Sequence, residues 1–319
     1  MWGEEELEGF NPERVAMMAD MVRELDLSRP VAQAGHIQPS VDGKNWAALD
    51  LMGWNYGRRY MSYRKQYPDR PIIYSESAST FSTRGYYDPE LPAHDTDYSD
   101  AYQISSYDLN AAEWSDIPDF EFNLMETDTY VAGEFVWTGF DYIGEPTPHA
   151  DHARSSYFGI ADLAGFPKDR YWLYRSHWRP EETTVHILPH WNWPNRIGKN
   201  VPVFVYTNGD SAELFLNGES LGTRRKGAVP EGAASSSAGN EYYNVTYNYR
   251  LRWDEVSYEP GELKAIAYKD GKAIGQARVE TTGAPARLEL VADRNVVAAD
   301  GEDLVFITVN ALDSQGRQH

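Results

Sequence analysis

The sequence contains 49 Asp and Glu residues and no cysteine, so carboxylates are the first groups to consider for chemistry. Glu76 is the strongest candidate, because it follows the apolar run 71–75 and its neighbours Ser75 and Ser77 are small enough to leave it accessible. A carboxylate in such a position can act as a nucleophile or as a general acid or base. The alternative is an ordinary solvated acid in a turn.

Other polar and aromatic side chains also stand where apolar runs end. Trp137 ends one run and is followed by Asp141 and Glu145, and Asn55 with Tyr56 ends another. A tryptophan can stack on a sugar ring or pack between domains, and an amide or phenol can orient a carboxylate or a substrate hydroxyl. Purely structural roles are the alternative for each of these residues.

Two groups of ionisable residues are placed outside the site. Glu134 lies early in its apolar run, at the end of the strand that is typical of stability rather than catalysis. His186 and His190 stand close to two tryptophans, but no acid lies near them in the sequence and no cysteine exists to complete a zinc site. We therefore predict no metal site there.

The first 180 residues alternate between strand-like and helical segments. Asn11 and Pro12 open a predicted helix, as its cap and first-turn residue. This alternation predicts a parallel sheet, and polar residues at strand ends are typical of a (β/α)8 barrel. We count four strand–helix units where a barrel has eight, which indicates part of a barrel or a different α/β fold. The strands are expected at 30–34, 49–56, 71–74 and 131–137, and further helices at 58–67 and 121–129.

The pattern changes to all-β after about residue 180. Short alternating strands are separated by Asn208-Gly209, Asn217-Gly218 and Asp270-Gly271, which are strong turn signals. Residues 181–283 are therefore predicted to form a β-sandwich, with a flexible loop at 226–241. Residues 284–319 supply strands at 286–292 and 303–311, too few for a sandwich core, and are interpreted as the start of an Ig-like domain.

Composition restricts the partners. The net charge of −20 argues against nucleic acid and anionic membranes. No apolar run approaches the roughly 18–20 residues of a membrane-spanning helix. The opening MWGEEELEGF is acidic and is not typical of a signal peptide, and the lack of cysteine excludes disulfides.

Two long motifs resemble glycoside hydrolase family 2, in particular its bacterial β-galactosidases. Residues 70–87, RPIIYSESASTFSTRGYY, are similar to the nucleophile segment, and residues 133–148, GEFVWTGFDYIGEPTP, to the eighth barrel strand and its loop. Residues 157–180 resemble the linker of those enzymes. The resemblance implies the C-terminal part of a (β/α)8 barrel (1–180), an accessory β-sandwich (181–283) and a truncated Ig-like domain (284–319).

The resemblance also assigns roles to individual residues. It implies that Glu76 is the nucleophile and that Trp137 lies near the bound sugar. Asn55 and Tyr56 match a motif in which the tyrosine contacts the nucleophile, and Asp141 matches an acid in the eighth-strand loop. The residues expected to contribute to substrate binding are Asn55, Tyr56, Trp137 and Asp141.

The acid/base residue of the family follows a W-S-x-G-N-E motif. The best alignment sets Gly3-Glu4-Glu5 against G-N-E, which makes Glu5 the acid/base. Two residues are then missing after Trp2, and Glu4 replaces the asparagine that is expected to bond the sugar's 2-hydroxyl. A second carboxylate beside Glu5 would also disturb its titration through repulsion.

The implied activity is a retaining hydrolysis that releases terminal β-galactose from oligo- or polysaccharides. The alternatives are an inactive or sugar-binding fragment of such an enzyme, or a member specific for a β-glucuronide, a β-mannoside or an algal galactan. The expected partner is carbohydrate, and self-association of the chain is left open. No organic cofactor is implied. A divalent or alkali cation, as in some relatives, is left open without an identifiable ligand set.

A periplasmic or extracellular location in a bacterium is expected by association with polysaccharide processing. Any signal peptide would then precede residue 1.

Overall fold

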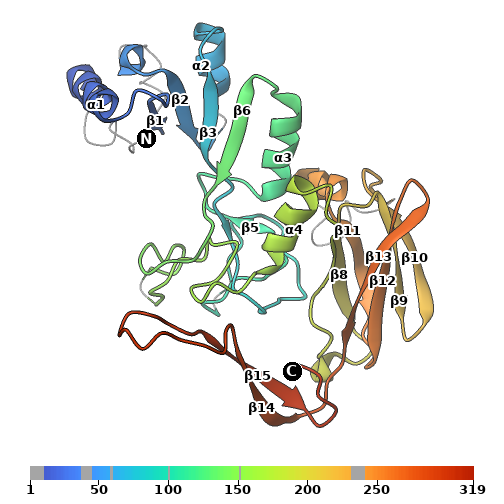
Figure 1. Cartoon of the computed structure of the whole chain (residues 1–319). Coiled ribbons are helices and arrows are strands. Elements are labelled where there is room, and N and C mark those ends of the chain that lie inside the picture. The colour runs from blue at the N-terminus through green and yellow to red at the C-terminus, as the bar shows by residue number, and fades with distance from the viewer. Residues whose placement is uncertain (1–10, 37–44, 58–59, 100, 151, 231–240) are drawn as a thin grey trace.

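The computed structural model describes residues 11–36, 45–57, 60–99, 101–150, 152–230 and 241–319 (Figure 1). A parallel sheet with helices comes first in the chain, an antiparallel sandwich follows, and a two-stranded hairpin ends it. The mixed α/β part followed by an all-β part agrees with the fold class expected from the sequence. No helix among the described residues is long and apolar enough to cross a membrane.

The parallel sheet has the strand order β1-β2-β3-β6. Its strands are β1 (Ala32–Gly35), β2 (Leu51–Asn55), β3 (Ile72–Ser77) and β6 (Val131–Val136). The helices around it are α1 (Pro12–Leu25), η3 (Asn45–Ala48), α2 (Tyr60–Gln66), α3 (Pro118–Thr127) and α4 (Asp169–Trp178), and a small ladder joins β4 (Thr80–Phe81) to β5 (Asn110–Ala111). The four predicted strands are thus the four strands of this sheet, and their carboxyl ends lie at one edge because all four run parallel.

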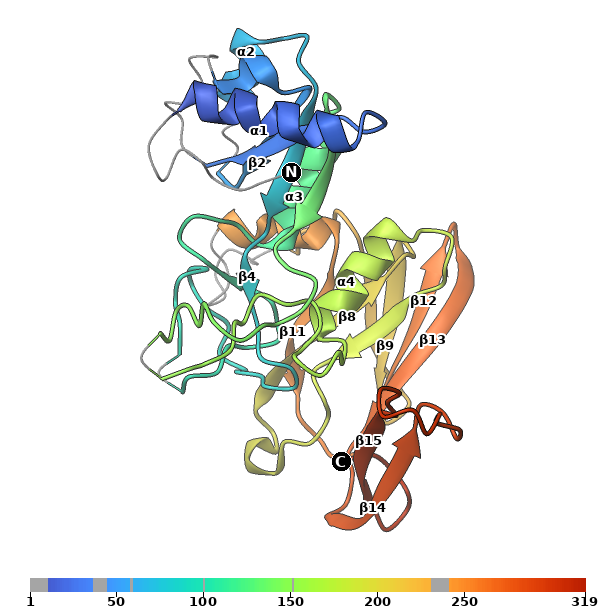
Figure 2. The same ribbon diagram turned by 60° about the vertical axis from the view of Figure 1, so that its left-hand side comes forward.

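Helix α1 forms as the sequence predicts. The Asn11 side chain accepts a hydrogen bond of 3.0 Å from the backbone N–H of Arg14, and Pro12 occupies the first turn, where it needs no N–H partner. Val15 and Ala19, four residues apart, are buried in the core that α1 shares with the sheet. The helix lies beside β2 (Figure 2).

Two helices differ from the sequence-based expectation. The segment expected to be helical over 121–129 forms α3, which begins at Pro118 because proline suits the first helical turn. Residues 157–180, expected as a linker, contain the whole of helix α4. Its buried face includes the charged residues Asp169 and Arg170, so no apolar stripe marked it in the sequence.

Two antiparallel sheets form the sandwich. One contains β7 (Val185–Leu188), β8 (Asn200–Thr207) and β11 (Leu251–Ser257); the other contains β9 (Ser211–Leu216), β10 (Glu219–Arg225), β12 (Glu262–Lys269) and β13 (Lys272–Glu280). The short helices η4 (Pro194–Arg196) and η6 (Glu241–Asn248) lie in its connections. Alternate residues of both sheets, such as Val203, Leu214 and Ala265, meet in one fully buried core. Of the predicted loop 226–241, residues 231–240 lie outside the described residues.

A buried polar joint fixes the sandwich to α3. Arg250, just before β11, is fully buried, and its Nε lies 2.9 and 3.0 Å from the two carboxylate oxygens of Asp119 in α3. The same guanidinium donates to the carbonyl of Tyr107 at 2.7 Å, while the Tyr107 hydroxyl donates to the carbonyl of Pro202 in β8 at 2.6 Å. Polar bonds therefore cross the boundary in both directions, within a shared aromatic core.

The last two strands, β14 (Pro285–Ala292) and β15 (Ile307–Asp313), form a separate hairpin. The expected strand at 303–311 begins four residues later than predicted. Leu288, Leu290 and Val309 are more than half exposed on this hairpin.

Candidate active site

Glu76 stands at the carboxyl end of β3 and is bound by Tyr56 from the end of β2. The Tyr56 hydroxyl donates to Glu76 Oε2 at 2.7 Å, and its backbone N–H donates to the Glu76 carbonyl at 2.9 Å. Tyr56 has a φ of +48°, a left-handed conformation that costs a non-glycine residue energy and is often found at functional sites. The phenol is thereby turned back onto the carboxylate.

The Tyr56 phenol remains a hydrogen-bond donor at any physiological pH. Burial first, and then the charge of Glu76, raises the pKa of the Tyr56 phenol well above its usual range. Asn55, fully buried beside it in β2, pairs in register with Glu76 and accepts a 2.7 Å hydrogen bond from the Ser75 hydroxyl. The structure thus brings together three of the residues predicted from the sequence.

Trp137 approaches this group from the neighbouring strand. Its backbone N–H donates to the Ser77 carbonyl at 2.8 Å, which places it beside the end of β3. The Trp137 ring meets the Tyr142 ring edge to face, with centroids 6.0 Å apart. The Tyr142 hydroxyl in turn donates to the Glu145 carboxylate.

Tyr142 is not among the residues singled out in the sequence, and Glu145 is named there without a role, yet both belong to this cluster. Burial, then Glu145, raises the pKa of the Tyr142 phenol above its usual range, and Glu76 adds to the effect. Glu145 likewise acts on Tyr56. Both lie in an irregular loop, where neither a strand period nor a helix period indicates which side chains face the site.

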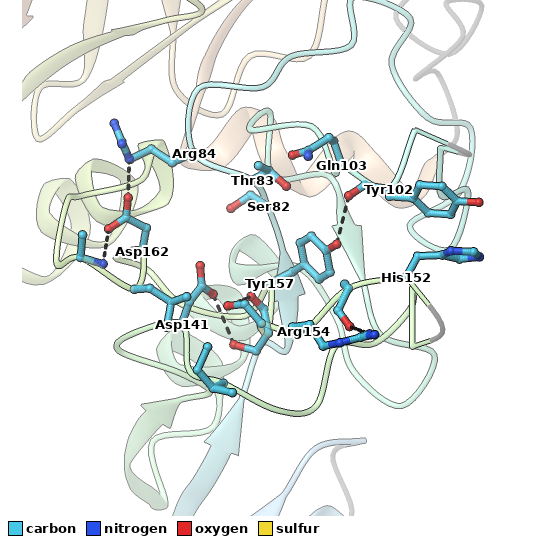
Figure 3. Close-up of a pocket in the computed structure, with 16 residues that line it drawn as sticks. Ser82, Thr83, Arg84, Tyr102, Gln103, Asp141, His152, Arg154, Tyr157 and Asp162 are labelled. Atoms are coloured by element: carbon cyan, nitrogen blue, oxygen red, sulfur yellow. Dashed lines mark hydrogen bonds and ion pairs between the residues drawn. The ribbon is translucent and has the colours of Figure 1, made fainter.

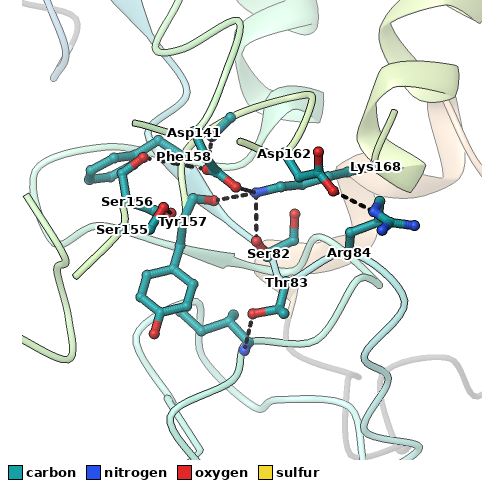
Figure 4. Close-up of polar contacts among 12 residues, drawn as sticks. Ser82, Thr83, Arg84, Asp141, Ser155, Ser156, Tyr157, Phe158, Asp162 and Lys168 are labelled. Atoms are coloured by element: carbon teal, nitrogen blue, oxygen red, sulfur yellow. Dashed lines mark hydrogen bonds and ion pairs between the residues drawn. The ribbon is translucent and has the colours of Figure 1, made fainter. Parts of the chain in front are cut away.

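Asp141, in the same loop, forms an ion pair with Lys168 (Figure 4). Its carboxylate lies 2.7 Å from the Lys168 ammonium and accepts a 2.8 Å hydrogen bond from the Gly159 N–H. Lys168 is itself buried, and this burial lowers the pKa of its ammonium to about 8. Asp141 therefore joins the loop to the start of α4, and its role as a sugar ligand stays a prediction.

Two further acids were considered from the sequence. Glu5 lies outside the described residues. Glu134 in β6 accepts a 2.7 Å hydrogen bond from the Ser77 hydroxyl, and it acts electrostatically on Tyr174 of α4. Burial raises the pKa of the Glu134 carboxyl to about 7. Glu134 is thus placed against α4 rather than in the Glu76 cluster.

His186 and His190, in the histidine-rich segment, both contact neighbouring protein side chains. His186 lies 2.7 Å from Asp169 of α4, the acid that the local sequence did not reveal, and stacks on Trp172. His190 stacks on Trp193. In the described ranges, no group of three or more His, Cys, Asp or Glu residues is arranged to hold a metal ion.

Comparison with known proteins gives matches over almost the entire chain. Residues 198–275, within the sandwich, match a family described as a domain of unknown function, DUF4982. The chain is 37% identical to the beta-galactosidase BoGH2A of Bacteroides ovatus, over 99% of this chain and 36% of that protein. It is 28% identical to a beta-glucuronidase of Formosa agariphila, over 80% of this chain and 24% of that protein.

A solved structure is similar in fold as well as in sequence. This is a glycosyl hydrolase family 2 member from Bacteroides cellulosilyticus, with a TM-score of 0.68 and 29% identity, covering 96% of this chain and 36% of that one. The chain thus spans between 24 and 36% of the length of these relatives. On this similarity, which extends over nearly all of its residues, the protein belongs to glycoside hydrolase family 2.

Proposed function

We propose that the protein is a retaining glycosidase that releases terminal β-galactose, with Glu76 as the nucleophile. The observation that carries this proposal is the tyrosine bound to Glu76 at the carboxyl end of β3, with Trp137 on the next strand. We further propose that residues 1–180 are part of a (β/α)8 barrel, followed by an accessory sandwich (181–283) and the start of an Ig-like domain (284–319).

In the proposed mechanism, Glu76 attacks the anomeric carbon and forms a covalent glycosyl-enzyme. An acid protonates the leaving oxygen and then, as a base, activates the water that releases the sugar. We assign that second role to Glu5. Retention requires the two carboxyl groups to stand about 5–5.5 Å apart. In this mechanism Tyr56 holds Glu76 through its hydrogen bond, and the Trp137 ring packs against the sugar.

Galactose is proposed as the sugar because the relative with 37% identity is named a beta-galactosidase. The beta-glucuronidase relative, at 28% identity, supports β-glucuronides as the alternative. We propose a periplasmic or extracellular location in a bacterium, where polysaccharides are processed. The high acidity and lack of cysteine are compatible with that location.

A mechanism-based label tests the proposal. Incubation with a 2-deoxy-2-fluoro-β-galactosyl fluoride should add one fluorosugar, and peptide mass spectrometry should locate it on Glu76. The Glu76→Gln variant should remain unlabelled. A label on another residue would reject the assignment. If no label forms although galactosides bind, the sugar-binding alternative is supported instead, and a preference for the matching glucuronide reagent would correct the sugar.

A further inference from the structure

A cavity of about 670 Å³ lies among the loops beyond the carboxyl ends of β3 and β6 (Figure 3). Its walls come from the segments 82–84, 102–103, 152–157 and 162–164, together with Asp141 and Ile143. Its volume falls within the usual range of small-molecule sites, about 300–1,000 Å³.

The cavity lies next to the Glu76 cluster but is separate from it. Asp141 and Ile143 line the cavity, whereas Tyr142, between them in sequence, contacts Trp137 in the Glu76 cluster. The loop after β6 therefore presents alternate side chains to two different spaces. None of Glu76, Tyr56 and Trp137 is among the residues that line the cavity.

The charges of the residues that line the cavity balance, two arginines against two carboxylates, although the chain carries −20 overall. Its two carboxylates are already bound by cations, Asp141 by Lys168 at 2.7 Å and Asp162 by Arg84 at 2.6 Å. Arg154 is a third cation, exposed at the wall, where its Nη1 donates to the carbonyl of Ala153. Within the described residues no carboxylate pairs with Arg154.

An aromatic surface stands beside Arg154. The rings of Tyr102 and His152 are in contact at a tilt of 31°, with centroids 4.2 Å apart, and both residues are exposed. The Tyr157 hydroxyl donates to the Tyr102 carbonyl at 3.0 Å and joins the two loops that carry these rings. Opposite them, Thr83 accepts a backbone hydrogen bond through its hydroxyl oxygen, which leaves the hydroxyl proton to donate elsewhere.

We propose that this cavity binds an anionic sugar unit, a pyranose that carries a carboxylate or a sulfate. The planar guanidinium of Arg154 can bind either oxyanion through two parallel hydrogen bonds. The exposed ring of Tyr102 can pack against the apolar face of the pyranose, and Thr83 can bond its hydroxyls. The link to catalysis rests on the proposed function, since the anionic unit would belong to the polysaccharide substrate, but binding itself needs no turnover.

Calorimetric titration of the whole chain with three small probes tests the proposal. The probes are methyl β-glucuronide, galactose 6-sulfate and neutral methyl β-galactoside. The anionic probes should bind about tenfold more tightly than the neutral one, the difference expected of one charge-assisted pair. Binding of only one anionic probe would identify its oxyanion as the one recognised, and binding of both would show that any oxyanion suffices.

Variants separate this cavity from the Glu76 cluster. Arg154→Gln, at an exposed position, should remove the preference for the anionic probes, and Tyr102→Ala should weaken all three. Arg179→Gln is a matched control, because Arg179 is also exposed but pairs with Glu181 away from the cavity. Equal affinity for neutral and anionic probes, or an unchanged preference in Arg154→Gln, would overturn the proposal. Loss of anion binding in Glu76→Gln would do the same by moving the site to the other cluster.

Discussion

At the scale of single residues, the Tyr56 hydroxyl donates a hydrogen bond directly to the Glu76 carboxylate. Tyr56→Phe keeps the buried ring but removes the 2.7 Å bond to the carboxylate. A hydrogen bond to a charged group contributes about 1.5–3 kcal/mol, so kcat on a chromogenic β-galactoside should fall about 10- to 100-fold. Tyr98→Phe is the control: it also loses one hydrogen bond, to the Ala111 carbonyl, but it should leave kcat unchanged. Equal losses in both variants would contradict a specific role for Tyr56.

The raised pKa of the Glu134 carboxyl predicts how the free energy of unfolding depends on pH. The pKa of its carboxyl is about 7 in the folded protein and 4.5 in its ordinary state, so between these values the folded protein binds more protons than the unfolded chain. The free energy of unfolding therefore falls as pH rises from about 4.5 to 7, and the loss is complete above pH 7. Glu134→Gln, which can still accept from Ser77, should be more stable than the parent at pH 8 by about 1–3 kcal/mol.

Urea unfolding at several pH values measures this effect. At pH 4 the two proteins should have equal stability, because the Glu134 carboxyl is then protonated in both states. Asp108, whose pKa burial raises to about 6, titrates in the same window but is present in both proteins, so it cancels in the comparison. A stability difference that does not change with pH would show that Glu134 is ionised in the folded state.

At the scale of elements, the joint between α3 and the sandwich depends on Arg250. Arg250→Met leaves the Asp119 carboxylate buried without its cation and should lower the free energy of unfolding by about 3–5 kcal/mol. Adding Asp119→Asn should restore part of this loss, since no uncompensated charge then remains. Arg179→Met, at an exposed ion pair, should leave urea unfolding unchanged. If the double variant were as unstable as the sum of both single variants, the pair would not be coupled.

The elements that the sequence predicts well are those fixed by local chemistry. Asn11 determines the start of α1 through its cap bond, and Pro12 through its place in the first turn. Asn217-Gly218 and Asp270-Gly271 adopt the positive φ values that tight hairpins require. Helix α4 was missed because its buried polar residues find partners far away in sequence, as Asp169 does with His186. The same holds for the site. Glu76 and Tyr56 could be predicted because they stand at the ends of strands, whereas the loop that carries Tyr142 has no helical or strand-like periodicity to indicate which side chains face the site.

At the scale of the whole molecule, the excess of negative charge opposes the compact state through self-repulsion. At pH 7.5, raising NaCl from about 20 to 300 mM shortens the screening length severalfold and should raise the melting temperature by a few degrees. The comparison at pH 4.7, close to the isoelectric point, is the control, because the net charge and therefore the salt effect should be near zero there. An equal salt response at both pH values would point to a cause other than net charge.

The position of Arg250 also limits how such proteins can be recombined. Every group to which the Arg250 guanidinium donates a hydrogen bond, apart from the Tyr206 hydroxyl, comes from the first 120 residues. A gene fusion that attached this sandwich to an unrelated scaffold would separate the Arg250 guanidinium from the Asp119 carboxylate and from the carbonyls that it binds. The sandwich and α3 must therefore be inherited, transplanted or engineered as one unit.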